Sequence, residues 1–320
     1  MNGAARQANI LPVNRKRSAP ANEKGAAVSA HRTKAEVPKN AERDQQICDF
    51  RLEDTDSKEE KNKMDINKLK ETIRAEIERG QYSLMNDELF GYVFGREESR
   101  DITAEFLSAA LEKDFGHPIT GISFMPPMEL PVHGDRDLVS RIAARCELGD
   151  EEHIFAELQL VNYMESRELP LACCATMYSA QPEYDLNPCA TVSILSYGLL
   201  EKKSWYSDYH FHNLETGDLL DNGMGLHFLE VPKFKREDGK PLSSMTRPER
   251  WMAFFAYCLN DVEKKELSEI DPAIGRAYDA AEDFFKDAKN VSRYIDRETG
   301  LRLFRAAMQD VNKNGKDRVE

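Results

Sequence analysis

The order of periodic segments along this 320-residue chain predicts an α/β fold, a mixed sheet flanked by helices with a helical C-terminal region. Three observations support this prediction. Helical spacing of apolar residues comes first, strand-like apolar runs occupy the middle, and the last third returns to helical spacing. Hydrophobic residues make up 41% of the chain, which is ordinary for a globular protein.

The first ordered segment is expected to be helical. Ile and Leu residues recur at spacings of three and four over residues 66–79, which predicts an amphipathic helix. Shorter helical patterns follow at 87–94 and 101–111. A short strand is predicted at 122–125, inside a stretch that Pro and Gly residues interrupt.

The centre of the chain holds the predicted strands. Residues 138–147 and 153–161 read as a hairpin about the Gly149-Asp150 pair. A helix is predicted within 165–179, starting after Pro170. Further apolar or alternating runs predict three more strands: 190–197, 206–212 and 226–231.

The C-terminal third is predicted to be helical. Thr246 and Glu249 form a capping-box pattern, and apolar residues at helical spacing follow from Trp251 to Val262. Asp271-Pro272 is expected to begin another helix, and a last helix is predicted at about 296–308.

Composition divides the chain into three predicted parts: a disordered tail at 1–64, a domain at 65–240 and a helical region at 241–320 that packs on it. Residues 1–43 carry nine Lys/Arg against three Asp/Glu, a net charge of +6, so the rest of the −13 chain carries −19. So acidic a body is not expected to coat DNA non-specifically. The basic tail fits a targeting presequence, a nucleic-acid-binding arm, a passive solvated tail or an over-called start site.

Location and redox state follow from the same composition. No apolar run approaches the roughly 20 residues of a membrane helix, and no secretory signal follows the basic residues, so a cytoplasmic protein is expected. The six cysteines lack the spacing of a zinc site and are predicted to be reduced, buried thiols.

The strand predicted at 153–161 carries the most informative polar residues. Glu157 and Gln159 are two residues apart, so both side chains point to the same face. Burying a carboxylate is costly unless something pairs with it. The partner can be a divalent metal ion, or Arg141 or Arg145 across the hairpin, and Gln159 can be a core amide that is satisfied by hydrogen bonds.

Several motifs in order resemble the Rpn family of recombination-promoting nucleases, also described as PD-(D/E)XK nuclease family transposases. The resemblance spans about residues 84–262. The matching segments are 87–95 (DELFGYVFG), 156–159 (AELQ), 181–188 (QPEYDLNP) before 192–195 (VSIL), 227–234 (HFLEVPKF) and 251–259 (WMAFFAYCL).

The resemblance implies a restriction-endonuclease-like mixed sheet and a metal-dependent DNA endonuclease that hydrolyses phosphodiesters. It implies Mg²⁺ or Mn²⁺ held by Asp137 (or Asp135), Glu157 and an acid of the 87–94 helix, Asp87 or Glu88. The ion polarises the scissile phosphate and activates a water, while Gln159 orients that water. Asp87 can instead simply lie near the positive end of its helix.

One departure from the family pattern concerns the second acid. The best register places Arg141 where the family has an Asp, and an arginine cannot bind a cation. Asp137 shares the parity of Arg141 but lies about 13 Å further along a regular strand. The alternative is therefore a catalytically inactive nuclease-fold module that binds DNA or protein. A third reading is an interaction protein whose C-terminal helices form a homodimer.

The remaining candidates have structural alternatives. By family position, Arg167 and Lys233 are expected to contact DNA phosphates, although both can be solvated surface charges. His210 and His212 lie two apart on a strand and can share a metal ion, but no third ligand is evident, and an aromatic strand with two exposed histidines is the preferred interpretation. His227 is expected to be a packing residue, and Cys173-Cys174 part of the core.

Overall fold

The computed structural model describes residues 56–127, 139–149, 152–162, 167–182, 186–220, 223–237, 240–256 and 259–316. From Asp56 onward the described residues belong to one compact unit, and residues 1–55 lie outside the described residues.

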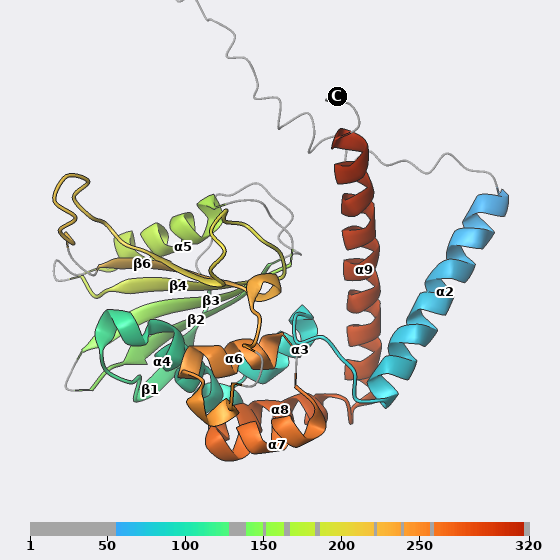
Figure 1. Ribbon diagram of the computed structural model, residues 1–320, viewed down its shortest axis with the longest axis horizontal. Coiled ribbons are helices and arrows are strands. Elements are labelled where there is room, and N and C mark those ends of the chain that lie inside the picture. The colour runs from blue at the N-terminus through green and yellow to red at the C-terminus, as the bar shows by residue number, and fades with distance from the viewer. Residues whose placement is uncertain are drawn as a thin grey trace, which may run out of the picture. The chain divides into compact units, whose positions relative to one another are not determined.

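A six-stranded sheet with the order β1-β2-β3-β4-β6-β5 is the centre of this unit (Figure 1). Strand β2 runs antiparallel to its neighbours β1 and β3, strands β3, β4 and β6 run parallel, and β5 returns antiparallel at the edge. The predicted α/β class with a mixed sheet is thereby confirmed. The strands are β1 (Gly121–Met125), β2 (Val139–Glu147), β3 (His153–Val161), β4 (Cys189–Leu195), β5 (Tyr206–Tyr209) and β6 (Met224–Glu230).

Helices cover both faces of the sheet. In Figure 1, α5 lies on one face, and α4 and α6 lie on the other. Within the described segments, no helix combines the length and the apolar content that a membrane span requires. The helices are α2 (Asp56–Glu78), α3 (Asp87–Phe94), α4 (Arg100–Phe115), α5 (Glu168–Ser179), α6 (Arg247–Phe255), α7 (Asp261–Ile270), α8 (Pro272–Phe284) and α9 (Ala288–Lys316).

The core reflects the central position of β3. Its Ile154, Ala156, Leu158 and Leu160 side chains join the large cluster formed with α3, α4, α6 and α8, which includes Phe94 and Trp251. The opposite face of the sheet packs under α5 through smaller clusters, so β3 is buried on both sides. A polar side chain on this strand must therefore find its partners inside the protein.

The structure corrects three predicted helix boundaries. Helix α5 starts at Glu168, before Pro170, because a proline in the first turn removes no intrahelical hydrogen bond. The Trp251 helix ends at Phe255, since the Asn260 side chain caps a separate helix, α7, and Val262 is exposed. The last helix begins at Ala288, eight residues earlier than predicted.

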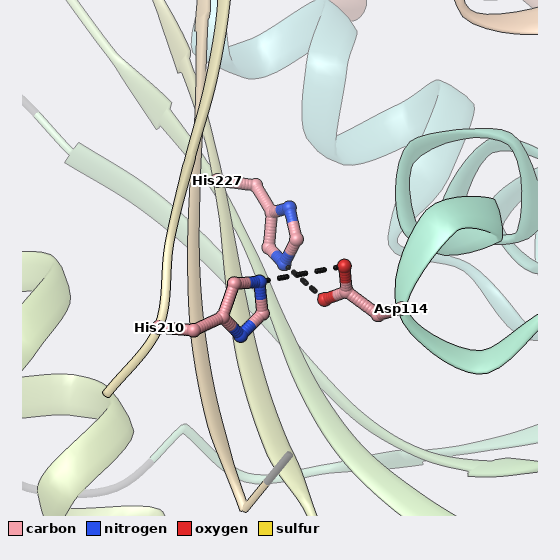
Figure 2. Close-up of side chains that lie close together, drawn as sticks. All are labelled: Asp114, His210 and His227. Carbon is pink, nitrogen blue, oxygen red and sulfur yellow. Dashed lines mark ion pairs between the residues drawn. The ribbon is translucent and has the colours of Figure 1, made fainter. Parts of the chain in front are cut away.

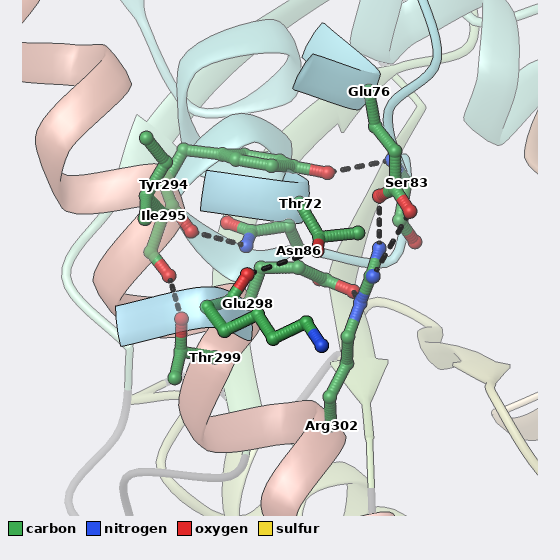
Figure 3. Close-up of polar contacts among 10 residues, drawn as sticks. Thr72, Glu76, Ser83, Asn86, Tyr294, Ile295, Glu298, Thr299 and Arg302 are labelled. Atoms are coloured by element: carbon green, nitrogen blue, oxygen red, sulfur yellow. Dashed lines mark hydrogen bonds and ion pairs between the residues drawn. The ribbon is translucent and has the colours of Figure 1, made fainter. Parts of the chain in front are cut away.

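Side chains of α9, the last described helix, contact α2, the first described helix, and the segment that follows it (Figure 3). Its Arg302 forms a bidentate ion pair with Glu76 of α2, at 3.2 and 2.6 Å. The Tyr294 hydroxyl accepts a 2.7 Å hydrogen bond from the backbone N–H of Ser83, and the Tyr294 carbonyl accepts one from Asn86 at 3.3 Å. These contacts fix α9 against α2 and the segment that leads into α3.

The cysteine prediction is confirmed where it can be examined. Cys146, Cys173, Cys174 and Cys189 are free and buried. Cys48 and Cys258 lie outside the described residues.

Candidate functional site

The β2–β3 hairpin positions the predicted site residues. Arg141 of β2 pairs with Gln159 of β3, and Ala143 pairs with Glu157. Paired residues point to the same face of an antiparallel sheet, so the Arg141, Glu157 and Gln159 side chains project together. This shared face lies under α5, because Glu157 also pairs with Thr191 of β4, whose neighbours Cys189 and Leu195 belong to the smaller clusters on that side.

Arg141 forms a bidentate ion pair with Glu157. Its Nε donates to Oε1 and its Nη2 to Oε2, both over 2.6 Å. The Glu157 side chain is 0% exposed and that of Arg141 is 18% exposed. Burial alone lowers the pKa of the guanidinium, but the hydrogen bonds and charge of Glu157 outweigh it and raise the net pKa. The structural alternative of an arginine partner is thus confirmed with Arg141.

Gln159 extends this pair into a polar chain across three strands. Its Nε2 donates to Glu157 Oε1 over 2.7 Å, and its Oε1 accepts from the Ser193 hydroxyl of β4 over 3.0 Å. Cys173 of α5 lies beside the chain, where burial, and then the charge of Glu157, raise its pKa to about 12. The thiol therefore stays protonated and is not a nucleophile at neutral pH.

The described residues around Glu157 do not fit a bound Mg²⁺ ion. Both carboxylate oxygens accept hydrogen bonds from the guanidinium, and a cation at that place would meet the positive charge of Arg141. The side chains that would have to supplement Glu157, Asp135 and Asp137, lie outside the described residues.

Asp87 belongs to another part of the molecule's polar network. It is the first residue of α3, after the Asn86 cap, and its Oδ1 lies 2.5 Å from Arg297 Nε of α9. The neighbouring Glu88 pairs with Arg293 of the same helix at 2.9 Å. In the described conformation, both acids hold α9 against α3.

Arg167 and Lys233, the two predicted phosphate contacts, differ in how many of their N–H donors already form hydrogen bonds within the protein. Arg167, at the start of α5, is exposed and donates one 3.4 Å hydrogen bond to the Leu199 carbonyl. Lys233 Nζ contacts the carbonyls of Leu200 and Lys202 and lies 2.7 Å from the buried Glu230 carboxylate. Three acceptors use the three protons of this ammonium group.

The structure also forms a cluster that was not predicted as a set. Asp114, near the end of α4, His210 and His227 bring their ligand atoms within 4.8 Å of one another. His227 was expected to pack in the core, and His210 was considered with His212 instead. The pairing of β5 with β6 creates the cluster, and an alternation of His and aromatic residues on 206–212 was its only signal in the sequence.

A mixed sheet whose central hairpin carries an acid and an amide two residues apart is the framework of a nuclease-like protein. The chain belongs to the PD-(D/E)XK nuclease family transposases: the model of that family matches residues 84–303, more than half of the chain. The match confirms the predicted family and the restriction-endonuclease-like fold, and it extends through α7 and α8 into α9. No curated protein and no solved structure matched the chain.

Nucleases of the PD-(D/E)XK type generally use divalent metal ions, and their substrate is DNA. In this chain Glu157 and Gln159 lie on β3, and Arg141 lies on the neighbouring strand β2.

Proposed function

We propose that this chain is a DNA-binding protein of the nuclease fold in which Arg141 has taken the place of the catalytic metal ion. The observation that supports this proposal is the 2.6 Å bidentate pair between Arg141 and the fully buried Glu157. The guanidinium neutralises the carboxylate that would otherwise attract Mg²⁺. Membership of the nuclease family supports DNA as the partner.

The DNA contact proposed on the described surface is Arg167. It is exposed, it belongs to the face of the sheet that carries Glu157, and one hydrogen bond leaves most of its donors available for phosphate. Lys233 is the weaker candidate for a phosphate contact, because its ammonium group already binds Glu230 and the carbonyls of Leu200 and Lys202. The basic segment 1–43, with a net charge of +6, is a further source of phosphate contacts.

A second candidate function is a Mg²⁺- or Mn²⁺-dependent DNA endonuclease that hydrolyses phosphodiesters. The Glu157 and Gln159 pair on β3 favours it, since the spacing and common orientation of the two side chains match the family pattern. Asp137, two residues before β2, would have to supply the missing acid, with Asp87 leaving Arg297 to join it.

Replacing Arg141 by aspartate separates the two candidates. Two carboxylates would then project from neighbouring strands, so Arg141→Asp is expected to gain Mg²⁺ binding that the wild type lacks. Arg145→Asp is the matched control, because Arg145 lies on the same strand and face, has the same charge and is exposed. Calorimetry with Mg²⁺ measures the difference.

DNA assays complete the test. The wild type is expected to bind duplex DNA in EDTA and to leave plasmid DNA intact in Mg²⁺, and Arg167→Ala should weaken binding and reduce its salt dependence. Cleavage by the wild type that Glu157→Gln abolishes would instead establish the endonuclease. Loss of all DNA binding in EDTA would contradict the proposed function.

A further inference from the structure

We infer that Asp114, His210 and His227 form a binding site for one divalent transition-metal ion of the Zn²⁺ type. Figure 2 shows the Asp114 carboxylate next to the two imidazoles. Asp114 Oδ2 lies 2.9 Å from His227 Nε2, and Asp114 Oδ1 lies 3.4 Å from His210 Nε2. Ligand atoms on a tetrahedral Zn²⁺ ion, with bonds of 2.0–2.2 Å, are about 3.4 Å apart.

The hydrogen bonds of His227 determine which ring nitrogen is available to an ion. The Tyr206 hydroxyl has one proton, which it donates to the Ala110 carbonyl at 3.1 Å. The same hydroxyl lies 2.9 Å from His227 Nδ1, so it accepts the Nδ1 proton. In the neutral ring, Nε2 then carries a lone pair. A metal-binding histidine commonly donates the proton of its other ring nitrogen to an oxygen acceptor, which fixes the orientation of the ring.

The orientation of that lone pair favours a shared cation over a hydrogen bond. His227 is 0% exposed, yet its Nε2 has no hydrogen-bond partner although Asp114 Oδ2 is only 2.9 Å away. The two atoms are close without meeting the geometry of a hydrogen bond. A lone pair beside a carboxylate is repulsive in a buried place unless a positive charge lies between them.

A glycine in the backbone beside the cluster leaves room for the three ligand side chains to meet. Gly225 is two residues before His227 on β6, so the side chain that it lacks would project on the same face. A Cβ atom there would lie 2.9 Å from His227 Nε2, 3.1 Å from His210 Cε1 and 3.2 Å from Asp114 Oδ2. Any side chain at position 225 would therefore displace the three ligands.

The chemistry of the donors selects the ion. Two imidazole nitrogens and one carboxylate oxygen suit Zn²⁺, Co²⁺ and related ions, whereas Mg²⁺ requires oxygen ligands. The Asp114 side chain is 5% exposed and that of His210 is 13% exposed, which leaves a narrow approach for an ion and a fourth, water ligand. Asp114 is the penultimate residue of α4, where the helix dipole also favours a cation.

The inferred site is separate from the one around Glu157. His227 pairs with Val192 of β4, which belongs to the large core cluster, whereas Glu157 pairs with Thr191 and faces α5. The two sites thus lie on opposite faces of the sheet. A Zn²⁺ ion here would connect the end of α4 to β6 and to the segment that follows the edge strand β5, and its role would be structural.

Zinc binding by the full chain tests the inference. After dialysis against a chelator, competition with a chromophoric zinc indicator is expected to show one tight site per chain that excess Mg²⁺ does not occupy. Zinc at 100 times its dissociation constant should raise the melting temperature by roughly 5–10 °C. Co²⁺ should give the visible absorption of a four-coordinate site.

Matched variants assign the site to these residues. His210→Gln and Asp114→Asn should each weaken zinc binding by at least about 100-fold, because loss of a ligand exceeds loss of a supporting hydrogen bond. His212→Gln is the control: this imidazole is exposed, lies two residues away and contacts the Gly217 carbonyl instead. Absence of tight zinc binding by the wild type, or equal affinity in His210→Gln and His212→Gln, would overturn the inference.

Discussion

Removing the cation beside Glu157 should destabilise the protein more than most single substitutions. Arg141→Ala leaves a fully buried carboxylate without its guanidinium and removes both 2.6 Å hydrogen bonds. Breaking a buried ion pair from one side costs about 3–5 kcal/mol. At about 4 kcal/mol, the melting temperature of a domain of this size should fall by roughly 8–16 °C.

Chemical denaturation with a matched control measures this loss. The free energy of unfolding of Arg141→Ala is compared with that of Arg145→Ala in urea at pH 7.5. Arg145 is exposed on the same strand, so its loss should change stability by less than about 0.5 kcal/mol. An unchanged urea m-value in both variants would show that the same surface unfolds.

A double variant distinguishes the buried charge from a general packing defect. In Arg141→Ala/Glu157→Gln the carboxylate becomes a neutral amide, so at least half of the lost stability should return. If Arg141→Ala unfolds with the same free energy as Arg145→Ala, or if the double variant is less stable than Arg141→Ala, then Glu157 does not depend on the guanidinium and the reasoning fails.

Three further outcomes follow from other parts of the fold. Burial raises the pKa of Cys146 from 9.0 to about 12, so the folded state keeps this proton and the free energy of unfolding should fall as pH rises from about 9 to about 12. Urea titrations in reductant measure this free energy at each pH. Its slope against pH should be about 1.4 kcal/mol per pH unit shallower in Cys146→Ala. Thr246→Ala removes a complete capping box and should cost about 1 kcal/mol, read from the denaturation midpoint. Phe94→Ala opens a cavity among Phe106, Trp251 and neighbouring rings and should cost about 3–5 kcal/mol by the same measurement.

Local signals account for the elements that could be predicted from the sequence. The capping box of Thr246 and Glu249 is formed as expected, because both partners lie within one turn. The common face of Glu157 and Gln159 follows from strand alternation alone, and their 2.7 Å contact agrees with it. The sequence leaves Arg141 and Arg145 open as partners of Glu157, and the observed register, in which Arg141 pairs with Gln159, selects Arg141.

Long-range packing explains what could not be predicted. The Trp251 helix stops at Phe255 even though apolar spacing continues to Val262, because the Asn260 side chain caps a separate helix, α7. The cluster of Asp114, His210 and His227 joins a helix end to two strands that are adjacent only through the antiparallel pairing of β5 and β6. Residues close together in the sequence give no signal for this cluster as a set.

The contact between α9 and the first described segment of the chain has a consequence for biosynthesis. Arg302 and Glu76 are 226 positions apart, and Asn86 and Tyr294 are 208 apart. A ribosome that adds about 5–20 residues per second needs roughly 10–45 s to make the intervening polypeptide. Throughout that interval the nascent α2 lacks its docking partner on α9, so the first of the described helices is among the last to be secured.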